Sequence, residues 1–201
     1  MTAVGRAVRH ILALPEGRKL IAIAGPPAGG KSWLAEKVAR RLVALGHTAT
    51  VVPMDGFHLD NERLSETGLL ARKGAPETFD AAGFVALVRG LKSGRDMTVP
   101  LFDRAADRVL PDADKVPADC RFVVVEGNYL LFDEDPWNQL AALWDISFFL
   151  DVPVAELRKR LVRRWRRHGL DAAAAEARAD ENDLPNALRV MKTRKAADLI
   201  F

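Results

Sequence analysis

Lys19 to Leu34 reads KLIAIAGPPAGGKSWL, and this stretch decides the fold of the chain. An apolar run stops at a glycine-rich turn, Gly25 to Ser32, and a helical pattern begins at Trp33. The turn fits G-x-x-x-x-G-K-[ST] and has the flanking elements that give this pattern its meaning, a buried strand before it and a helix after it. An ordinary glycine-rich turn would fit the letters alone, but the flanking elements favour a phosphate-binding loop.

Each part of this phosphate loop has a predicted task. The glycines let the backbone turn tightly and bring several N–H groups around one phosphate, at the positive end of the helix dipole. Lys31 adds a mobile cation for the β- and γ-phosphates, and the Ser32 hydroxyl is placed to bind Mg²⁺. The residues predicted to bind the nucleoside triphosphate are Gly25, Pro26, Pro27, Ala28, Gly29, Gly30, Lys31, Ser32 and Trp33.

The composition is that of an ordinary globular protein, and residues 1–201 fit a single domain. The net charge of +3 does not call for nucleic acid as a partner. Cys120 is the only cysteine, which excludes an intramolecular disulfide and favours a reducing, cytoplasmic location. Because the chain lacks an apolar stretch of membrane-spanning length, we expect no membrane partner. Whether the protein forms a homodimer is left open.

Apolar strands alternate with helices along the chain. Strands are predicted at 20–24, 48–54, 121–125 and 145–150, with a short final strand in 197–201. Helices are predicted at 32–45, 81–91, 154–168, 171–179 and 184–193. The strands are apolar throughout rather than alternating, which is typical of a parallel sheet covered on both faces. The sequence therefore predicts an α/β protein with three layers, α/β/α, around a mostly parallel five-stranded sheet.

Three of these strands end in an acid: Asp55, Glu126 and Asp151. Ligands of parallel sheets bind at the carboxyl ends of the strands. Phosphoryl transfer needs a carboxylate near Mg²⁺ and an acceptor for the hydroxyl proton. Acids also follow strands as simple turn residues, but the phosphate loop in the same sheet favours a catalytic role for Asp55 and Glu126, with Glu126 and Ser32 at the metal. Asp151 precedes a proline and a helix, so we expect it to start that helix.

The helix predicted at 154–168 is rich in arginine and contains one acid, Glu156. Arginines at spacings of three, four and seven share one broad face of a helix. Uncompensated arginines opposite a phosphate loop would stabilise transition-state charge, whereas a solvated surface helix is the alternative. We expect residues of about 154–183 to form a lid that carries Arg160, Arg163, Arg164 and Arg167, with Arg163 and Arg164 catalytic and Arg160 and Arg167 at the nucleotide.

The long middle segment, about 56–118, is predicted to bind the phosphate acceptor. Loops of this length in a compact domain are usually functional or disordered. Residues 59–79 and 103–118 read as irregular, with an extended segment at 97–102. The candidate acceptor-binding residues are Asp55, His58, Arg72, Lys73, Phe79, Asp103, Arg104 and Arg108. For His58, a loop position without a role is an equal alternative.

Four further motifs are VVPMDGFHLDN (51–61), RKGAPETFD (72–80), PLFDRAADR (100–108) and VVVEGNYLL (123–131). Together they resemble the uridine kinase, pantothenate kinase and phosphoribulokinase group of P-loop kinases. The resemblance implies the P-loop nucleoside triphosphate hydrolase fold, with Asp55 as the base toward the substrate hydroxyl and Glu126 near Mg²⁺ and the phosphates. Phe102 stands where uridine kinases have a tyrosine, which departs from their nucleoside site. With NDLPNA (182–187), the motifs look most like bacterial proteins labelled putative fructose transport system kinases.

These features predict an ATP-dependent small-molecule kinase that uses Mg²⁺ and phosphorylates a hydroxyl of a sugar, fructose among them, of a nucleoside, or of a pantothenate-like metabolite. The main alternative is a regulatory nucleotide switch without a small-molecule acceptor. An ATP-dependent ligase is a third, which the DGFH motif (55–58) fits less well than a hydroxyl acceptor. A guanine switch would have an N-K-x-D element, and the sequence has none. Asp80 to Gly83 does spell D-x-x-G, but it follows a loop and reads more simply as a helix start.

Overall fold

Strand β1 (Lys19–Ala24) lies at the centre of a five-stranded sheet in the computed structural model, which describes residues 2–201. The strand order is β2-β5-β1-β6-β7, and every pairing in it is parallel. The other strands are β2 (Ala49–Pro53), β5 (Phe122–Gly127), β6 (Ile146–Phe149) and β7 (Leu199–Ile200). The predicted parallel α/β/α architecture is confirmed.

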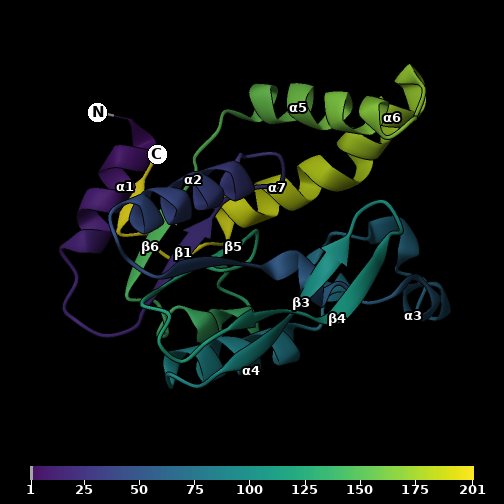
Figure 1. The fold of residues 1–201 in the computed structure, drawn as a ribbon. Helices are drawn as coiled ribbons and strands as arrows, with labels where there is room; N and C mark the ends of the chain where they lie inside the picture. Colours follow the sequence, from purple (N-terminus) through teal and green to yellow (C-terminus); the bar gives the residue numbers. More distant parts are fainter. Residues whose placement is uncertain (1) are drawn as a thin grey trace.

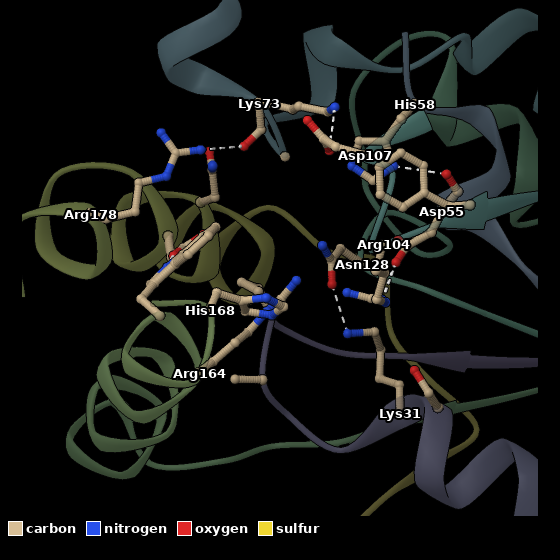
Figure 2. A pocket seen from close by; sticks show the side chains of 18 of the residues that line it. Lys31, Asp55, His58, Lys73, Arg104, Asp107, Asn128, Arg164, His168 and Arg178 are labelled. Atoms are coloured by element: carbon tan, nitrogen blue, oxygen red, sulfur yellow. Dashed lines mark hydrogen bonds and ion pairs between the residues drawn. The ribbon is translucent and has the colours of Figure 1, made fainter. Parts of the chain in front are cut away.

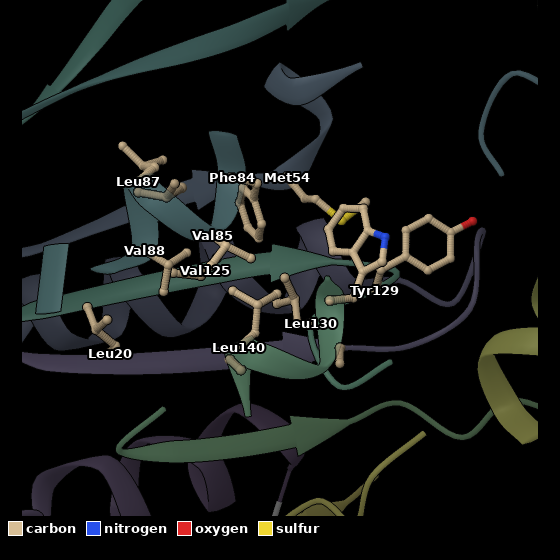
Figure 3. Close-up of a cluster of buried hydrophobic side chains, with 14 of the residues drawn as sticks. Leu20, Met54, Phe84, Val85, Leu87, Val88, Val125, Tyr129, Leu130 and Leu140 are labelled. Atoms are coloured by element: carbon tan, nitrogen blue, oxygen red, sulfur yellow. The ribbon is translucent and has the colours of Figure 1, made fainter. Parts of the chain in front are cut away.

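Helices cover both faces of this sheet (Figure 1). The side chains of β1 point alternately to opposite faces of the sheet. On one face, Ile21 and Ile23 pack with α1 (Ala3–Leu12) and α2 (Lys31–Ala44). Leu20 and Ala22 pack on the other face, where α4 (Ala81–Lys92) contributes much of the core. Figure 3 shows this second cluster, with Phe84, Val85 and Val88 of α4 over Leu20 and Val125. None of the helices in residues 2–201 is long and apolar enough to cross a membrane.

A separate antiparallel hairpin projects from the parallel sheet. It pairs β3 (Met97–Asp103) with β4 (Arg108–Val116), whereas the sequence predicted one extended segment followed by irregular chain. That prediction was wrong for β4, because the strand is mostly exposed and reads RVLPDADKV, a polar pattern typical of loops. The irregular region before α4 also contains a short helix, α3 (Asn61–Glu66).

Three C-terminal helices run along one side of the molecule (Figure 1). They are α5 (Val154–Arg167), α6 (Ala172–Arg178) and α7 (Leu184–Lys192), and a π-helical turn, η5 (Ala179–Asp183), joins the last two. The predicted role of Asp151 as the start of α5 was wrong. The N-cap of α5 is Pro153, no side chain of the described residues caps it, and Asp151 is exposed.

Close packing explains why the DGFH motif has a glycine at position 56. A Cβ at this buried position would overlap the Pro100 carbonyl oxygen and lie 2.7 Å from the Pro100 carbonyl carbon. Both atoms belong to the backbone of β3, which cannot move away without disturbing the hairpin. We therefore expect Gly56→Ala to lower the free energy of unfolding by about 1–3 kcal/mol, as overpacking usually does. Urea titration measures this change, and an unaltered midpoint would contradict the close approach of the two segments.

Candidate active site

A cavity of about 630 Å³ opens where the carboxyl ends of β1, β2 and β5 meet the C-terminal helices. The strand order explains its place, because β5 separates β1 from β2 and the loops that follow these strands diverge around a crevice. The predicted residues that line the cavity are Pro27, Ala28, Gly30, Lys31, Ser32, Trp33, Asp55, His58, Lys73, Phe79, Arg104, Glu126 and Arg164. Figure 2 shows several of them converging on one space from separate elements.

Two glycines shape the phosphate loop. Gly30 has φ +95°, a left-handed conformation that side chains rarely adopt, and a Cβ on Gly29 would lie 2.8 Å from the Pro26 carbonyl oxygen. Helix α2 begins at Lys31 with Gly30 as its N-cap, and no side chain within residues 2–201 caps it. The first N–H groups of α2 are therefore available to an anion, and the helix dipole favours one there.

Lys31 is buried at the base of the cavity (Figure 2). Its ammonium donates to the Pro26 carbonyl oxygen at 3.0 Å and to Asn128 Oδ1 at 2.7 Å. Burial lowers the pKa of Lys31, while the charges of Glu126 and Asp55 oppose that shift. An ammonium has three N–H donors, so two bonds hold the side chain in place and leave one donor for a ligand.

Ser32 and Glu126 form an oxygen pair beside Lys31. The Ser32 hydroxyl donates to Glu126 Oε1 at 3.1 Å, and burial raises the pKa of Glu126 against the opposing charge of Lys31. Magnesium prefers oxygen ligands and usually takes one or two protein groups together with water and substrate phosphates. The pair fits such a shared site. Residues 2–201 hold no cluster of three or more His, Cys, Asp or Glu side chains that would bind a metal unaided.

Asp55 reaches the same space from β2. It lies in a 3₁₀ turn, Met54–Phe57, and the register pairs Pro53 of β2 with Glu126 of β5, so the ends of both strands lie at one edge of the sheet. Arg104 of the hairpin donates to Asp55 Oδ2 at 2.5 Å. Within the described residues the other oxygen, Oδ1, has no hydrogen-bond partner and remains available to a ligand.

His58 lies between two phenylalanine rings. Its ring centroid is 4.1 Å from that of Phe79 and 4.7 Å from that of Phe102, and its Nδ1 is 2.8 Å from the Asp55 carbonyl oxygen. Burial lowers the pKa of His58 below its ordinary value of 6.5, although the nearby Asp55 charge opposes the shift. The contacts show that His58 holds the Asp55 turn against the hairpin.

The half-buried ring of His58 leads to an expected pH dependence of stability. Because its pKa is lower in the folded than in the unfolded chain, its contribution is complete above about pH 6.5 and is lost as the pH falls through the folded value. We expect His58→Phe to reduce the fall in Tm between pH 7.5 and pH 5. The exposed His168, changed to Phe, is the matched control. Equal slopes for wild type and His58→Phe would contradict this assignment.

Lys73 is tied to other side chains rather than free in the cavity. Its ammonium donates to Asp107 Oδ1 at 2.8 Å (Figure 2) and to Asn61 Oδ1 at 2.7 Å. Asn61 also donates to Asp107 Oδ2 at 2.7 Å. These bonds connect α3, the loop after it and the tip of the hairpin, so Lys73 gives this wall of the cavity a fixed shape.

The C-terminal helices form the opposite wall. Arg164, His168 and Arg178 lie across the cavity from Asp55 and His58 (Figure 2). Within residues 2–201, Arg164 has no carboxylate partner, and its guanidinium lies 5.7 Å from the centroid of the Trp165 ring. Burial lowers the pKa of Arg164, and the charge of Arg104 adds to this shift. Arg164 is thus a positive charge that a phosphate would complement.

Hydrogen bonds join the two walls. Arg178 of α6 donates to the Ala71 carbonyl oxygen at 2.5 Å, and Asn182 of the π-helical turn donates to the Lys73 carbonyl oxygen at 3.1 Å. The C-terminal helices and the loop at 71–73 therefore touch directly beside the cavity.

The remaining predicted residues are not among those that line the cavity. Gly25, Pro26 and Gly29 belong to the backbone of the phosphate loop, where the Gly29 N–H bonds the Pro26 carbonyl oxygen. Arg72 pairs with Glu77 at 2.6 Å. These contacts stabilise the loops that surround the cavity, although the residues themselves do not line it.

The other outlying residues lie on the hairpin and on α5. Asp103 accepts from the N–H groups at the hairpin tip, and Arg108 is exposed at the start of β4. Arg160 pairs with Glu156 at 2.8 Å and donates to the Ala28 carbonyl oxygen of the phosphate loop at 3.4 Å. Arg163 and Arg167 are the last two predicted site residues outside the cavity lining, and both are exposed.

Sequence reasoning did not select several residues that line the cavity. They are Leu70, Gly74, Phe102, Asp107, Asn128, Trp165, His168, Leu170, Arg178, Asp183 and Asn186. Asn128 lies two residues after the strand-end acid Glu126 in VVVEGNYLL, and this position in the sequence could have identified it as a candidate site residue. The D-x-x-G at Asp80 to Gly83 is a helix start, as expected, because the Asp80 carboxylate caps α4 by accepting from the Gly83 N–H at 2.9 Å.

The parallel sheet, the phosphate loop and the strand-end acids together define a kinase of the P-loop class. The chain belongs to the phosphoribulokinase / uridine kinase family, whose sequence model matches residues 20–201. This family comprises ATP-dependent kinases that transfer phosphate to hydroxyl groups of small molecules. The family predicted from the sequence motifs is confirmed.

Individual relatives match over almost the whole chain. The protein YggC of Escherichia coli K12 is 38% identical over 205 residues, which cover 98% of this chain and 85% of YggC. A protein of Schizosaccharomyces pombe named putative uridine kinase C227.14 is 36% identical, covering 92% of this chain and 83% of its own. A crystal structure from Silicibacter sp. TM1040, described as a putative fructose transport system kinase, is 47% identical with a TM-score of 0.94 and covers 100% of both chains.

Proposed function

We propose that this chain is a cytoplasmic kinase that transfers the γ-phosphate of Mg-ATP to a hydroxyl of a sugar, a nucleoside or a pantothenate-like metabolite. One observation carries the proposal: the ammonium of Lys31 and the carboxylate of Asp55 line the same cavity. The ammonium would bind a phosphate, and the carboxylate would accept the proton of a hydroxyl. The names borne by the relatives support a metabolite as acceptor, and fructose is among the candidates.

Asp55 is the proposed base toward the acceptor hydroxyl. Arg104 occupies Asp55 Oδ2 and so fixes the carboxylate, while Oδ1 is left to accept the hydroxyl proton. A general base must lie within hydrogen-bond reach of the proton that it accepts. The His58 ring behind the turn keeps Asp55 in position.

The phosphates would lie along the loop from Gly25 to Ser32. Lys31 would contact the β- and γ-phosphates with its remaining donor, and Ala28 and Trp33 would donate backbone N–H groups. Pro26 and Pro27 have no N–H and would contribute only to the shape of the loop. Bound Mg²⁺ would neutralise the phosphate charge, with Ser32 and Glu126 as its protein ligands. In phosphoryl transfer, positioning and charge stabilisation account for most of the catalysis.

Arg164 is the proposed lid arginine, because it lines the cavity without a carboxylate partner in the described chain. Arg160 contacts the phosphate loop through the Ala28 carbonyl, while Arg163 and Arg167 would join only after movement of α5. We infer that residues of about 154–183 act as the lid and about 56–118 bind the acceptor. The bonds from Arg178 and Asn182 to residues 71–73 would couple these regions.

A screen of ATP consumption tests this proposal. The purified protein is assayed with Mg-ATP and, one at a time, sugars, nucleosides, pantothenate and other hydroxylated metabolites, with Lys31→Ala as the blank. We expect consumption above the blank only when a suitable acceptor is present. Rapid hydrolysis that does not depend on any acceptor would overturn the proposal and favour a nucleotide switch.

A further inference from the structure

Two side chains of the NDLPNA motif, Asp183 and Asn186, face the cavity without an assigned role. Asp183 ends the π-helical turn η5, and Asn186 lies three residues later, on the same side of α7. A π-helical turn adds a residue to a helix and is found frequently at functional sites. Here the turn lies beside the cavity wall that faces Asp55.

The carboxylate of Asp183 is held in place, but one of its oxygens can still accept a hydrogen bond. Its Oδ2 accepts a hydrogen bond from Trp165 Nε1 at 2.5 Å, which holds the carboxylate in one orientation. Within residues 2–201, Oδ1 has no hydrogen-bond partner. The cavity therefore contains a preorganised acceptor oxygen on the wall opposite the proposed base.

Asn186 is mostly buried, and its side-chain amide opens into the cavity. The residue is 5% exposed, yet its side-chain amide makes no hydrogen bond to any residue of the described chain. The amide is not sealed from solvent, because the buried side-chain atoms without a partner in residues 2–201 are Arg121 Nε and Arg194 Nε, and it therefore opens into the cavity. A ligand in the cavity would supply the missing partner, because the amide offers both donors and an acceptor.

The surrounding charges select the kind of ligand group. Burial raises the pKa of Asp183, while the hydrogen bond from Trp165 and the charges of Arg164 and Arg178 oppose the shift. An ammonium group here would be repelled by the two arginines. A carboxylate would be attracted by the arginines, but it has no proton to donate to Asp183 Oδ1 and would meet a like charge there. A neutral hydroxyl meets neither repulsion, since it can donate to Asp183 Oδ1 and accept from the Asn186 amide.

We propose that Asp183 and Asn186 form a subsite that selects neutral, polyhydroxylated acceptors by binding a hydroxyl other than the one that is phosphorylated. This inference rests on the proposed kinase function and narrows its acceptor class. Recognition through buried polar groups is selective, because an acceptor lacking that hydroxyl would leave them unpaired.

Kinetics of matched variants test the subsite. Asp183→Asn keeps the shape and the oxygen that accepts from Trp165, but it replaces the free oxygen by an N–H donor. For the best neutral sugar acceptor among hexoses and pentoses, we expect this change and Asn186→Ala each to raise KM about tenfold or more. The kcat and the KM for ATP should stay near wild type. Asp180→Asn is the matched control, because Asp180 lies on the same turn but pairs with Arg158 at the surface.

Monodeoxy analogues of the same sugar separate recognition from a structural role. One analogue should cost wild type about tenfold in kcat/KM, and Asp183→Asn should no longer distinguish that analogue from the parent. Equal losses on parent and analogue in both variants would overturn the subsite, as would a wild-type preference for pantothenate or an amino sugar. If wild type phosphorylates none of the hydroxylated compounds, the kinase proposal itself fails. If it phosphorylates a sugar and the variants behave like Asp180→Asn, only the subsite fails.

Discussion

Replacing Lys31 by alanine is expected to lower kcat for phosphoryl transfer by on the order of 10³-fold, as the loss of a preorganised group that stabilises transition-state charge does. Lys31 is buried, held by Pro26 and Asn128, and placed where the loop meets Glu126. Water that fills the space would not replace a fixed positive charge on the transferred group. Steady-state rates with saturating Mg-ATP and acceptor measure the effect.

The matched control for this change is Lys37→Ala. Lys37 lies on the same helix, α2, but it is exposed and does not line the cavity. We expect it to keep nearly full activity, and circular dichroism should show that both variants are folded. A Lys31→Ala protein that is folded and retains more than about a tenth of the wild-type kcat would contradict the assigned role of the loop.

The Asp55→Asn variant is expected to lose about 10²–10⁴-fold in kcat with little change in ATP affinity, which is the usual contribution of a general base. The amide keeps the size of the carboxylate but cannot take the hydroxyl proton. In the proposed arrangement Asp55, held by Arg104, contacts the acceptor, so we expect binding of the nucleotide not to depend on it. Kinetics with acceptor, together with calorimetric titration of ATP, separate the two effects.

Asp119→Asn serves as the control for this variant, because Asp119 is an exposed acid outside the cavity lining. It should behave as wild type. A near-normal rate for Asp55→Asn with the true acceptor would exclude Asp55 as the base. A large loss of ATP affinity would instead place Asp55 at the nucleotide.

Much of the fold could be predicted because its strands are buried on both faces. Such strands read as continuous apolar runs, as in β1 and β5, and each is followed by a turn signal. The loop from Gly25 to Ser32 needs glycine at particular backbone positions, and these glycines can be recognised in the sequence. The hairpin strand β4 could not be read this way, since its exposed residues carry no apolar pattern.

The candidate site was most readily predicted where a residue follows a strand. Glu126 lies near the end of β5, Asp55 just beyond β2, and Lys31 after the loop that follows β1, and the parallel topology brings them together. Arg178, Asp183 and Asn186 reach the cavity through the packing of helices and a π-helical turn, which local sequence patterns do not specify. For the same reason the arginine pattern of α5 could not show that Arg164, rather than Arg163, lines the cavity.

Phosphorus-31 NMR of a single reaction tests most directly whether this chain is a small-molecule kinase. The protein is mixed with Mg-ATP and the acceptor that scores best in the ATP-consumption screen. We predict that the γ-phosphate signal of ATP is replaced by a phosphate monoester in an amount equal to the ADP formed, and that Lys31→Ala gives neither product. Inorganic phosphate as the sole product, formed at the same rate without acceptor, would contradict the account.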